Sequence, residues 1–291
     1  MAKEAIRFEN VSYAYGRGTP FCKVAADHID LSIREGVITG IIGHTGSGKS
    51  TVLQLMNGLL RPDEGRVYVQ GEDIWAKPKE IQKIAFKVGL VFQYPEYQLF
   101  EDTVEKDVAF GPKNMKLEKE EIDRRVKEAL NLVGLDYDVY AKRSPFELSG
   151  GEKRRVAIAG VIAMEPKILV LDEVAAGLDP EGREDILKLI KKLQKEKCPT
   201  VILISHNMDD IAYLADRILV LSKGKAEFLG TPKEVFANYD RMNELKLGVP
   251  LATRIQKKLE AKGMRFSEVC VTAEQLAIEL KKMNAKEADN V

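Results

Sequence analysis

The first third of the chain alternates short apolar segments with polar breaks, as strands and turns do. Residues 6–15 carry apolar side chains at alternate positions, apart from one polar pair, and predict a half-buried strand. Residues 37–42 form a continuous apolar run, which is typical of a fully buried strand. Residues 50–60 repeat apolar side chains at helical spacing and predict a helix. A turn at 62–65 and a strand at 67–69 complete this part.

The middle of the chain is polar and helical in its pattern. Over residues 118–133, apolar side chains recur every three or four positions, and Gly134 suits the C-terminal cap of the predicted helix. We interpret residues 94–165 as a helical subdomain that is inserted into a core of strands and helices.

Buried strands return after this segment. Residues 168–171, 200–204 and 218–221 are continuous runs of Ile, Leu and Val, which suit strands that are covered on both faces. The amphipathic segments between them indicate helices that join parallel strands. The pattern therefore predicts an α/β fold with a mainly parallel sheet.

The last sixty residues look like an appendix to this core. Thr272-Ala273-Glu274-Gln275 has the form of a capping box, and an apolar stripe of Leu276, Leu280 and Met283 follows it. Two interpretations stay open: a helix that packs on its own domain, and a contact with another subunit. The sequence contains no internal repeat, so we expect one domain of this kind per chain.

Composition narrows the classes of partner. Lys+Arg and Asp+Glu balance at 45 each, and this zero net charge gives no bulk attraction to nucleic acid or anionic lipid. No nucleic-acid partner is therefore expected. The three cysteines (Cys22, Cys198, Cys270) have neither a disulfide nor a metal-site spacing, so we expect reduced thiols. Because no apolar run approaches the ~18–20 residues that span a bilayer, any membrane role must work through a partner.

A glycine-rich loop stands between the predicted strand and helix near residue 45. It fits the phosphate-binding pattern G-x-x-x-x-G-K-[ST], and the residues concerned are Gly43, His44, Thr45, Gly46, Ser47, Gly48, Lys49 and Ser50, with Thr51 next in the helix. The glycines let backbone N–H groups point at phosphate oxygens, and the helix adds its positive end. Lys49 would lie near the β- and γ-phosphates of a nucleotide, and the Ser50 hydroxyl can ligate Mg²⁺.

Four polar residues follow buried strands and suit the chemistry of a nucleotide. Asp172 ends an apolar strand, where holding Mg²⁺ through water would explain a carboxylate. Glu173 comes next and can polarise an attacking water as general base. The Gln93 amide, at the start of the insert, can touch Mg²⁺ or that water. The imidazole of His206, after the strand at 200–204, can contact the γ-phosphate.

The motifs occur in an order that resembles the ATP-binding-cassette (ABC) ATPases, over residues 1 to about 235. The resemblance rests on six motifs: the phosphate loop, Gln93 of the Q-loop, the signature Leu148-Ser149-Gly150-Gly151-Glu152, the strand ending in Asp172-Glu173, the D-loop Ala176-Gly177-Leu178-Asp179, and the switch histidine His206. Tyr15 matches the aromatic residue on which adenine stacks in the family.

The resemblance implies a fold and a mechanism. The expected fold class is an α/β, P-loop NTPase core of the ABC type with an N-terminal antiparallel β subdomain, the inserted helical subdomain and, over 236–291, a C-terminal extension that could serve in dimerisation. In the family two cassettes pack head to tail, so Ser149, Gly150 and Gly151 would cap ATP on the partner's phosphate loop. The expected ligands are ATP and Mg²⁺, with Ser50, Gln93 and Asp172 toward the metal, and Glu173, His206 and Gln93 in catalysis.

A narrower resemblance follows the Q-loop. Residues 93–100 and 103–112 are similar to the ATPases of energy-coupling factor (ECF) importers, and most to the second of their two paralogues. That resemblance implies uptake of vitamins or transition-metal ions at the cytoplasmic face of the cell membrane, where the chain would be a peripheral protein. The implied partners are a second ABC ATPase, a transmembrane coupling protein (EcfT-like) and a substrate-binding membrane S component. Residues 94–112 are the expected coupling surface.

The chain departs from the ABC family pattern at one position of the catalytic motif. The family usually has proline after the catalytic glutamate, and this chain has Val174, so we expect altered tuning of a retained activity.

Three alternative functions are considered, and the main one is an ATPase of another ABC importer branch. A DNA-repair or chromosome ATPase is disfavoured because the chain has no sustained heptads. A ribosome-associated factor is disfavoured because such factors carry two cassettes per chain.

Overall fold

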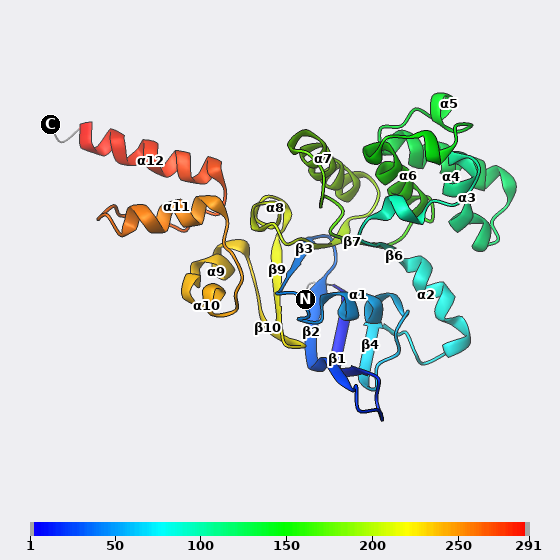
Figure 1. Ribbon diagram of the computed structural model, residues 1–291, viewed down its shortest axis with the longest axis horizontal. Coiled ribbons are helices and arrows are strands. Elements are labelled where there is room, and N and C mark those ends of the chain that lie inside the picture. The colour runs from blue at the N-terminus through cyan, green and yellow to red at the C-terminus, as the bar shows by residue number, and fades with distance from the viewer. Residues whose placement is uncertain (1–2, 289–291) are drawn as a thin grey trace.

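The larger of two sheets forms the centre of the protein. The structure, a computed structural model, describes residues 3–288 (Figure 1). The strand order is β10-β9-β3-β8-β7-β6, and the neighbouring strands are parallel except for the β10–β9 pair. These strands are β3 (Ile38–Ile42), β6 (Val88–Val91), β7 (Ile168–Asp172), β8 (Thr200–Ile204), β9 (Arg217–Ser222) and β10 (Lys225–Gly230). The predicted mainly parallel sheet is confirmed.

Alternate side chains of the central strands enter two different cores. In β7, Leu169 and Leu171 belong to a core with the helical insert, whereas Ile168 and Val170 belong to a core with helix α1 and the smaller sheet. The side chains of a strand point alternately to its two faces. The continuous apolar runs of the sequence are thus explained, because both faces of this sheet are covered.

The smaller sheet is antiparallel and has the order β2-β1-β4-β5. Its strands are β1 (Glu4–Tyr15), β2 (Lys23–Arg34), β4 (Glu64–Val69) and β5 (Glu72–Asp73). The polar pair in the first predicted strand is a bulge, where the register shifts between Phe8 and Val11 and Asn10 has φ +47°. The turn predicted at 62–65 is too long, because Gly65 already lies in β4, where a Cβ would come within 2.2 Å of the Asn10 carbonyl oxygen.

Helices cover the two faces of the central sheet. α1 (Lys49–Asn57) and α2 (Ile81–Lys87), with a 3₁₀ turn η1 (Pro78–Glu80) before it, lie on the side of the smaller sheet. α7 (Pro180–Glu196) and α8 (Met208–Leu214) lie on the other face. α1 ends three residues before the predicted helix does, because Gly58 takes the left-handed conformation (φ 78°) and caps it.

The helical insert leaves the sheet after β6 and returns at β7 (Figure 1). Its elements are η2 (Pro95–Gln98), α3 (Val104–Asn114), α4 (Lys119–Leu132), α5 (Tyr137–Tyr140), η3 (Pro145–Glu147) and α6 (Gly150–Ile162). α4 agrees with the helix predicted over 118–133 to within one residue at each end, and Gly134 has φ +81° after it.

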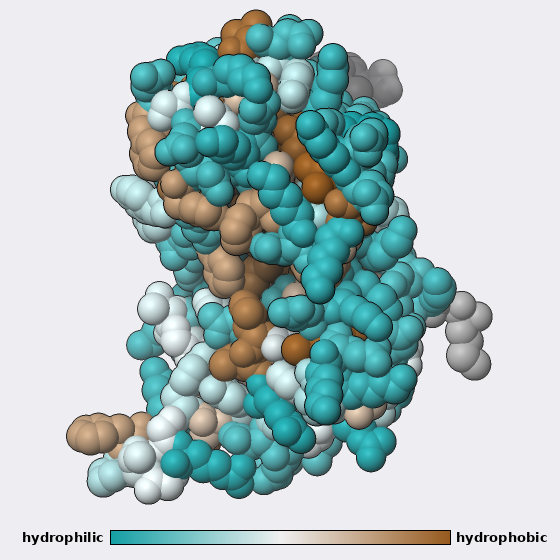
Figure 2. All heavy atoms as spheres, turned by 90° about the vertical axis from the view of Figure 1, so that its right-hand side faces the viewer, coloured by the Kyte–Doolittle hydropathy of each residue, from teal (hydrophilic) through white to brown (hydrophobic). Residues whose placement is uncertain are grey.

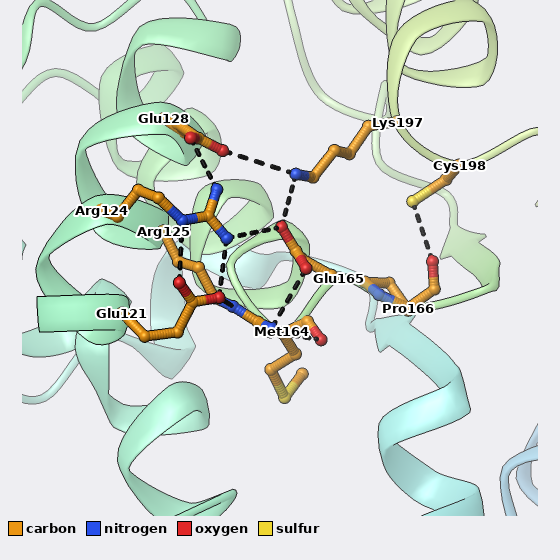
Figure 3. A network of polar contacts seen from close by, with 9 residues as sticks. All are labelled: Glu121, Arg124, Arg125, Glu128, Met164, Glu165, Pro166, Lys197 and Cys198. Carbon is orange, nitrogen blue, oxygen red and sulfur yellow. Dashed lines mark hydrogen bonds and ion pairs between the residues drawn. The ribbon is translucent and has the colours of Figure 1, made fainter. Parts of the chain in front are cut away.

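Charged side chains join the insert to the sheet domain, as Figure 3 shows. Glu165, in the turn after α6, accepts ion pairs from Arg125 of α4 at 3.1 Å and from Lys197 at the end of α7 at 2.6 Å. Arg124 of the same insert helix lies 3.5 Å from Glu165 as well. The Glu165 carboxylate is therefore the centre of a polar bridge between the insert and the sheet domain. The backbone of Glu165 is left-handed, with φ +53°.

The C-terminal segment forms a group of helices at the end of the molecule opposite the insert (Figure 1). They are α9 (Pro232–Ala237), α10 (Tyr239–Glu244), α11 (Leu251–Glu260) and α12 (Ala273–Ala288). α11 and α12 enclose a small core of their own that includes Cys270, Leu276 and Leu280. Within residues 3–288, no helix combines the length and apolar character that crossing a bilayer requires.

Candidate nucleotide site

The phosphate loop curls between the end of β3 and the first turn of α1. Gly46 (φ +80°) and Gly48 (φ +103°) take left-handed conformations that only glycine adopts readily. A Cβ on Gly48 would lie 2.3 Å from the Ala25 carbonyl oxygen, and one on Gly43 would lie 2.3 Å from Ser47 Oγ. The glycines are thus required both by backbone conformation and by space. His44 and Thr45 lie at the rim of the loop, where they are partly or fully exposed.

The side chains inside the loop are arranged for an anion. The Lys49 ammonium is buried and donates to the carbonyl oxygens of Gly43 at 2.7 Å and His44 at 3.2 Å. Burial lowers the pKa of Lys49, and the nearby carboxylates of Glu173 and Asp172 oppose that shift. Ser47 Oγ is buried, and no atom within residues 3–288 hydrogen-bonds to it. A phosphate oxygen would satisfy this hydroxyl and the ammonium together.

Tyr15 lies beside the same loop. Its hydroxyl is 3.2 Å from Thr51 Oγ1 in α1, and its ring packs edge-on against Tyr13 with centroids 5.0 Å apart. The ring is 41% exposed, so part of its surface is free for a planar ligand. The end of β1 thus places the predicted adenine-stacking residue next to the helix that follows the phosphate loop.

Two carboxylates meet at the end of β7. The pKa of Asp172 is raised to about 6 because the group is buried and close to Glu173, while Lys49 opposes the shift. Glu173 follows with φ +51°, a strained conformation for a residue with a side chain, which costs about 1–3 kcal/mol. Its backbone N–H donates to the Ile204 carbonyl oxygen of β8 at 3.1 Å.

The Glu173 side chain is the meeting point of the other predicted catalytic residues. His206 Nε2 lies 2.8 Å from Glu173 Oε1, and Gln93 Nε2 lies 3.4 Å from Glu173 Oε2. The three residues follow β8, β7 and β6, whose carboxyl ends lie along one edge of the sheet. The parallel strands therefore bring together three groups from distant parts of the sequence. The Glu173 carboxylate has the His206 imidazole at one oxygen and the Gln93 amide at the other.

The donors near Asp172 fit a hard divalent cation. Ser50 offers a hydroxyl, Gln93 an amide oxygen and Asp172 a carboxylate, which are ligands that Mg²⁺ accepts. The raised pKa of Asp172 shows that its charge lacks full compensation from the protein. No group of three or more His, Cys, Asp and Glu residues within 3–288 could hold a metal ion by itself. The site therefore suits an ion that is shared with a bound phosphate.

An ion pair with a buried carboxylate near this edge was not predicted from the sequence. Arg183 of α7 donates to Asp210 of α8 at 2.6 Å, and Ser205 Oγ is 3.5 Å from the second oxygen of Asp210. These residues line, with His206, a cavity of ≈ 380 Å³ that opens beside Glu173. The only signal in the sequence was the position of Asp210 four residues after His206.

The structure does not bring the signature residues to the chain's own phosphate loop. Ser149 caps α6 in a capping box with Glu152, and a Cβ on Gly150 or Gly151 would meet open space. The buried side chains of α6 belong to the core on one face of the sheet, and those of α1 belong to the core on the other. The hydroxyl and N–H groups at the start of α6 thus form an exposed anion cradle.

Comparison with known proteins gives a consistent picture. The profile of the ABC transporter family matches residues 26–176. The chain is 52% identical over 286 residues to the energy-coupling factor transporter ATP-binding protein EcfA2 of Clostridium tetani, which covers 98% of this chain and 99% of the relative. It is 50% identical over 279 residues to EcfA2 of Enterococcus faecalis, covering 95% of this chain and 96% of the relative.

Solved structures agree with the fold. CbiO1 of Clostridium perfringens, described as part of the ABC transporter complex CbiONQ, superimposes with a TM-score of 0.74 at 40% identity, over 89% of this chain and 99% of that one. The dimeric bacterial ABC transporter cassette MJ0796 superimposes with a TM-score of 0.68 at 33% identity, over 78% of this chain and 98% of that one.

Proposed function

The chain belongs to the ABC transporter family, and on this premise we propose that it is the second-paralogue ATP-binding and ATP-hydrolysing subunit of an energy-coupling factor importer. The observation that carries hydrolysis is the contact of Glu173 with both His206 and Gln93, beside the phosphate loop. The assignment to an energy-coupling factor importer is supported by a sequence identity of about one half to EcfA2 proteins, along nearly the whole length of those relatives. Its cargo in this proposal is a vitamin or a transition-metal ion.

The mechanism assigns each residue of the site a step. Lys49 exchanges its two carbonyl partners for phosphate oxygens of ATP. Glu173 accepts the proton of the attacking water, while His206 and Gln93 hold the carboxylate and the water in line. Mg²⁺, held by Ser50, Asp172 and Gln93, would neutralise part of the phosphate charge. The ring of Tyr15 supports the adenine.

The second half of each site comes from another subunit in this proposal. The exposed cradle of Ser149, Gly150 and Gly151 caps the nucleotide on the partner's phosphate loop, and the partner's signature caps ATP on this chain. ATP then holds the two subunits together, and hydrolysis lets them separate. We propose a paralogous ATPase as the partner, because the relatives named EcfA2 represent one of two kinds of subunit.

The coupling surface of the proposal is residues 94–112. Tyr97 is 84% exposed, and Phe100 and Phe110 pack edge-on with centroids 5.0 Å apart while both stay half exposed. Figure 2 shows hydrophobic side chains gathered in a hollow at the middle of the face on which α2 and α3 lie, between the insert and the sheet domain. An exposed apolar area of this kind fits a protein partner, which we propose is the transmembrane coupling protein.

The division of labour along the chain is part of the same proposal. Residues 1–235 form the ATPase domain, with the helical subdomain at about 94–165. The extension 236–291 serves as a dimerisation element, which is supported by the exposed apolar side chains of Leu251, Ile255 and Ile278 on α11 and α12. The chain then works as a peripheral protein on the cytoplasmic face of the membrane.

Purification of the membrane complex without a tag on this chain tests the assignment. We expect three other proteins in stoichiometric amounts: a second, non-identical ABC ATPase, a transmembrane coupling protein and a small substrate-binding membrane protein. Two identical ATPase chains with a pair of large permeases and a soluble binding protein would instead identify the alternative, an importer of another ABC branch.

A further inference from the structure

The signature helix carries a buried arginine that the catalytic scheme above does not use. Arg154 is 4% exposed, and its guanidinium joins three segments of the chain. Nε and Nη2 donate to the two carboxylate oxygens of Glu96 at 3.1 and 2.7 Å. Nη1 donates to the backbone carbonyl oxygens of Val174 at 3.0 Å and Ala176 at 2.8 Å. One side chain of α6 thus holds both η2 and the loop that follows Glu173.

The contacts with the loop bear on the catalytic carboxylate. Glu173 has φ +51°, and a residue with a side chain stays in this conformation only where its surroundings fix it. The hydrogen bond to the Ile204 carbonyl oxygen fixes the backbone on one side of Glu173. Arg154 fixes the next carbonyl groups on the other side. The guanidinium therefore sets the direction in which the Glu173 carboxylate leaves the strand.

The contacts with Glu96 bear on the coupling surface. Glu96 lies in η2 next to Tyr97, whose ring is 84% exposed. Burial raises the pKa of Glu96, but the hydrogen bonds from Arg154, a backbone hydrogen bond and the charge of Arg154 together outweigh burial and hold that pKa below its ordinary value. The pair is therefore charged at neutral pH and bidentate, which resists sliding of one segment against the other. Through this pair, η2, which carries Tyr97, is joined to α6.

We propose that Arg154 is a positioning residue that links the coupling surface to the catalytic carboxylate, so that docking of the membrane partner on η2 adjusts the orientation of Glu173. The link rests on the proposed function, because it presupposes ATP hydrolysis and a partner on residues 94–112. Arg154 touches neither the nucleotide nor the attacking water. It acts through the backbone that carries Val174 and through Glu96.

Four single variants of this chain, each in the complete membrane complex in lipid vesicles, test the link. Arg154→Gln removes the contacts with Glu96 and with the two backbone carbonyl groups. Arg154→Lys keeps the positive charge but lacks the planar guanidinium that donates to both partners at once. Glu96→Gln leaves Arg154 bound to the two carbonyl groups and removes only the ion pair with η2. Arg125→Gln is the matched control, because Arg125 is also a largely enclosed arginine (side chain 13% exposed, against 4% for Arg154) whose partners Glu121 and Glu165 lie outside the nucleotide site.

We expect the variants to separate hydrolysis from coupling. For Arg154→Gln and Arg154→Lys, kcat for ATP should fall about 10–100-fold, the loss expected when a catalytic group is misplaced, with KM for ATP within about twofold. For Glu96→Gln, basal hydrolysis should stay within about threefold of the unmodified complex, while cargo moved per ATP falls at least about tenfold. Arg125→Gln should keep both kcat and the transport ratio, even if its melting temperature is lower.

Two results would overturn the link. The first is an Arg154→Lys complex, folded by circular dichroism, whose kcat is within twofold of the unmodified complex. The second is a Glu96→Gln complex in which transport and hydrolysis fall in parallel or not at all. Failure of the proposed function would give a different result, because the unmodified complex would then hydrolyse ATP without moving cargo. The comparison of kcat between the Arg154 variants and the unmodified complex would still decide the role of Arg154.

Discussion

At the residue scale, Glu173 is held through both its backbone and its carboxylate. The backbone is strained at φ +51°, the N–H is held by β8, and the side-chain oxygens contact His206 and Gln93. These contacts, all within the chain, orient the carboxylate. The loop is held on the other side of Glu173 as well, although Val174 stands in place of the family's usual proline, because Val174 is fully buried and its carbonyl group accepts a hydrogen bond from Arg154.

Glu173→Gln should separate binding from hydrolysis. The amide keeps the size and the hydrogen-bonding capacity of the carboxylate, but it cannot accept the proton of the attacking water. We expect ATP affinity within about threefold of the unmodified protein and a kcat lower by about 10²–10⁴-fold. Equilibrium binding of ATP and phosphate release measure the two quantities. A kcat near that of the unmodified protein would remove Glu173 from the role of general base.

Asp172 makes the free energy of unfolding depend on pH. Its pKa is about 6 in the folded protein and 3.8 in the reference state, so the folded chain binds more protons between pH 4 and 6. The free energy of unfolding should therefore fall as pH rises through this window. Asp172→Asn should remove that fall and raise the free energy of unfolding at pH 7.5 by on the order of 1–2 kcal/mol, a value reduced for solvent screening of the partly exposed group.

Urea unfolding of the nucleotide-free protein at pH 4.5, 5.5 and 7.5 measures this dependence. The same pH slope in Asp172→Asn and in the unmodified protein would show that another group carries it. The variant is also expected to lose ATP hydrolysis. The residue would thus be kept for function at the expense of stability.

Secondary structure was predictable wherever one physical pattern dominated a segment. The buried strands were found because each is a continuous apolar run, and the helix at 118–133 was found because its apolar side chains recur at helical spacing. The strand at 23–34 was not located, because the register shift between β1 and β2 and the left-handed His28 (φ +48°) interrupt its alternation. The end of α1 before its cap Gly58 and the start of β4 at Glu64, next to Gly65, were also missed, because both depend on glycine conformations that periodicity does not report.

The polar bridge between the insert and the sheet domain yields a prediction at the scale of elements. Glu165→Gln removes the charge that faces Arg125 and Lys197, and it should lower the free energy of unfolding at pH 7.5 by about 1–3 kcal/mol. Glu184→Gln is the control, because among residues 3–288 Glu184 forms an ion pair only with Lys188, one helical turn away, and both side chains are more than half exposed. Its change should stay within about 0.5 kcal/mol.

Chemical denaturation of both variants measures the difference between them. The pKa of Glu165 is lowered: burial opposes the shift, and Lys197 and the two arginines outweigh it. The contribution of the bridge should therefore be present at neutral pH and be lost as the pH falls through the lowered pKa. Equal effects of Glu165→Gln and Glu184→Gln would show that the bridge does not hold the insert to the sheet domain.

For the whole molecule, sequence motifs predicted the family and the fold class, and both are confirmed by the relatives and by the sheet order. The motifs name residues because phosphate chemistry fixes their type and spacing. They could not reveal Arg154, since an arginine in the charged first turns of a helix is expected to be exposed, and its burial depends on packing against η2 and the loop after Glu173. The role of the C-terminal extension stays a prediction for the same reason, because it depends on a surface and a partner.

For the whole molecule, we propose that this chain contributes its phosphate loop to one nucleotide site and its signature to another. Trapping of a photoactivatable ATP analogue with vanadate in the purified complex tests it, because the label marks the subunit whose phosphate loop holds the nucleotide. With Ser149→Arg in this chain, we predict that this chain is still labelled and that its partner ATPase loses its label. Lys49→Ala should give the reverse. Loss of label from this chain in Ser149→Arg, with the partner still labelled, would contradict the account.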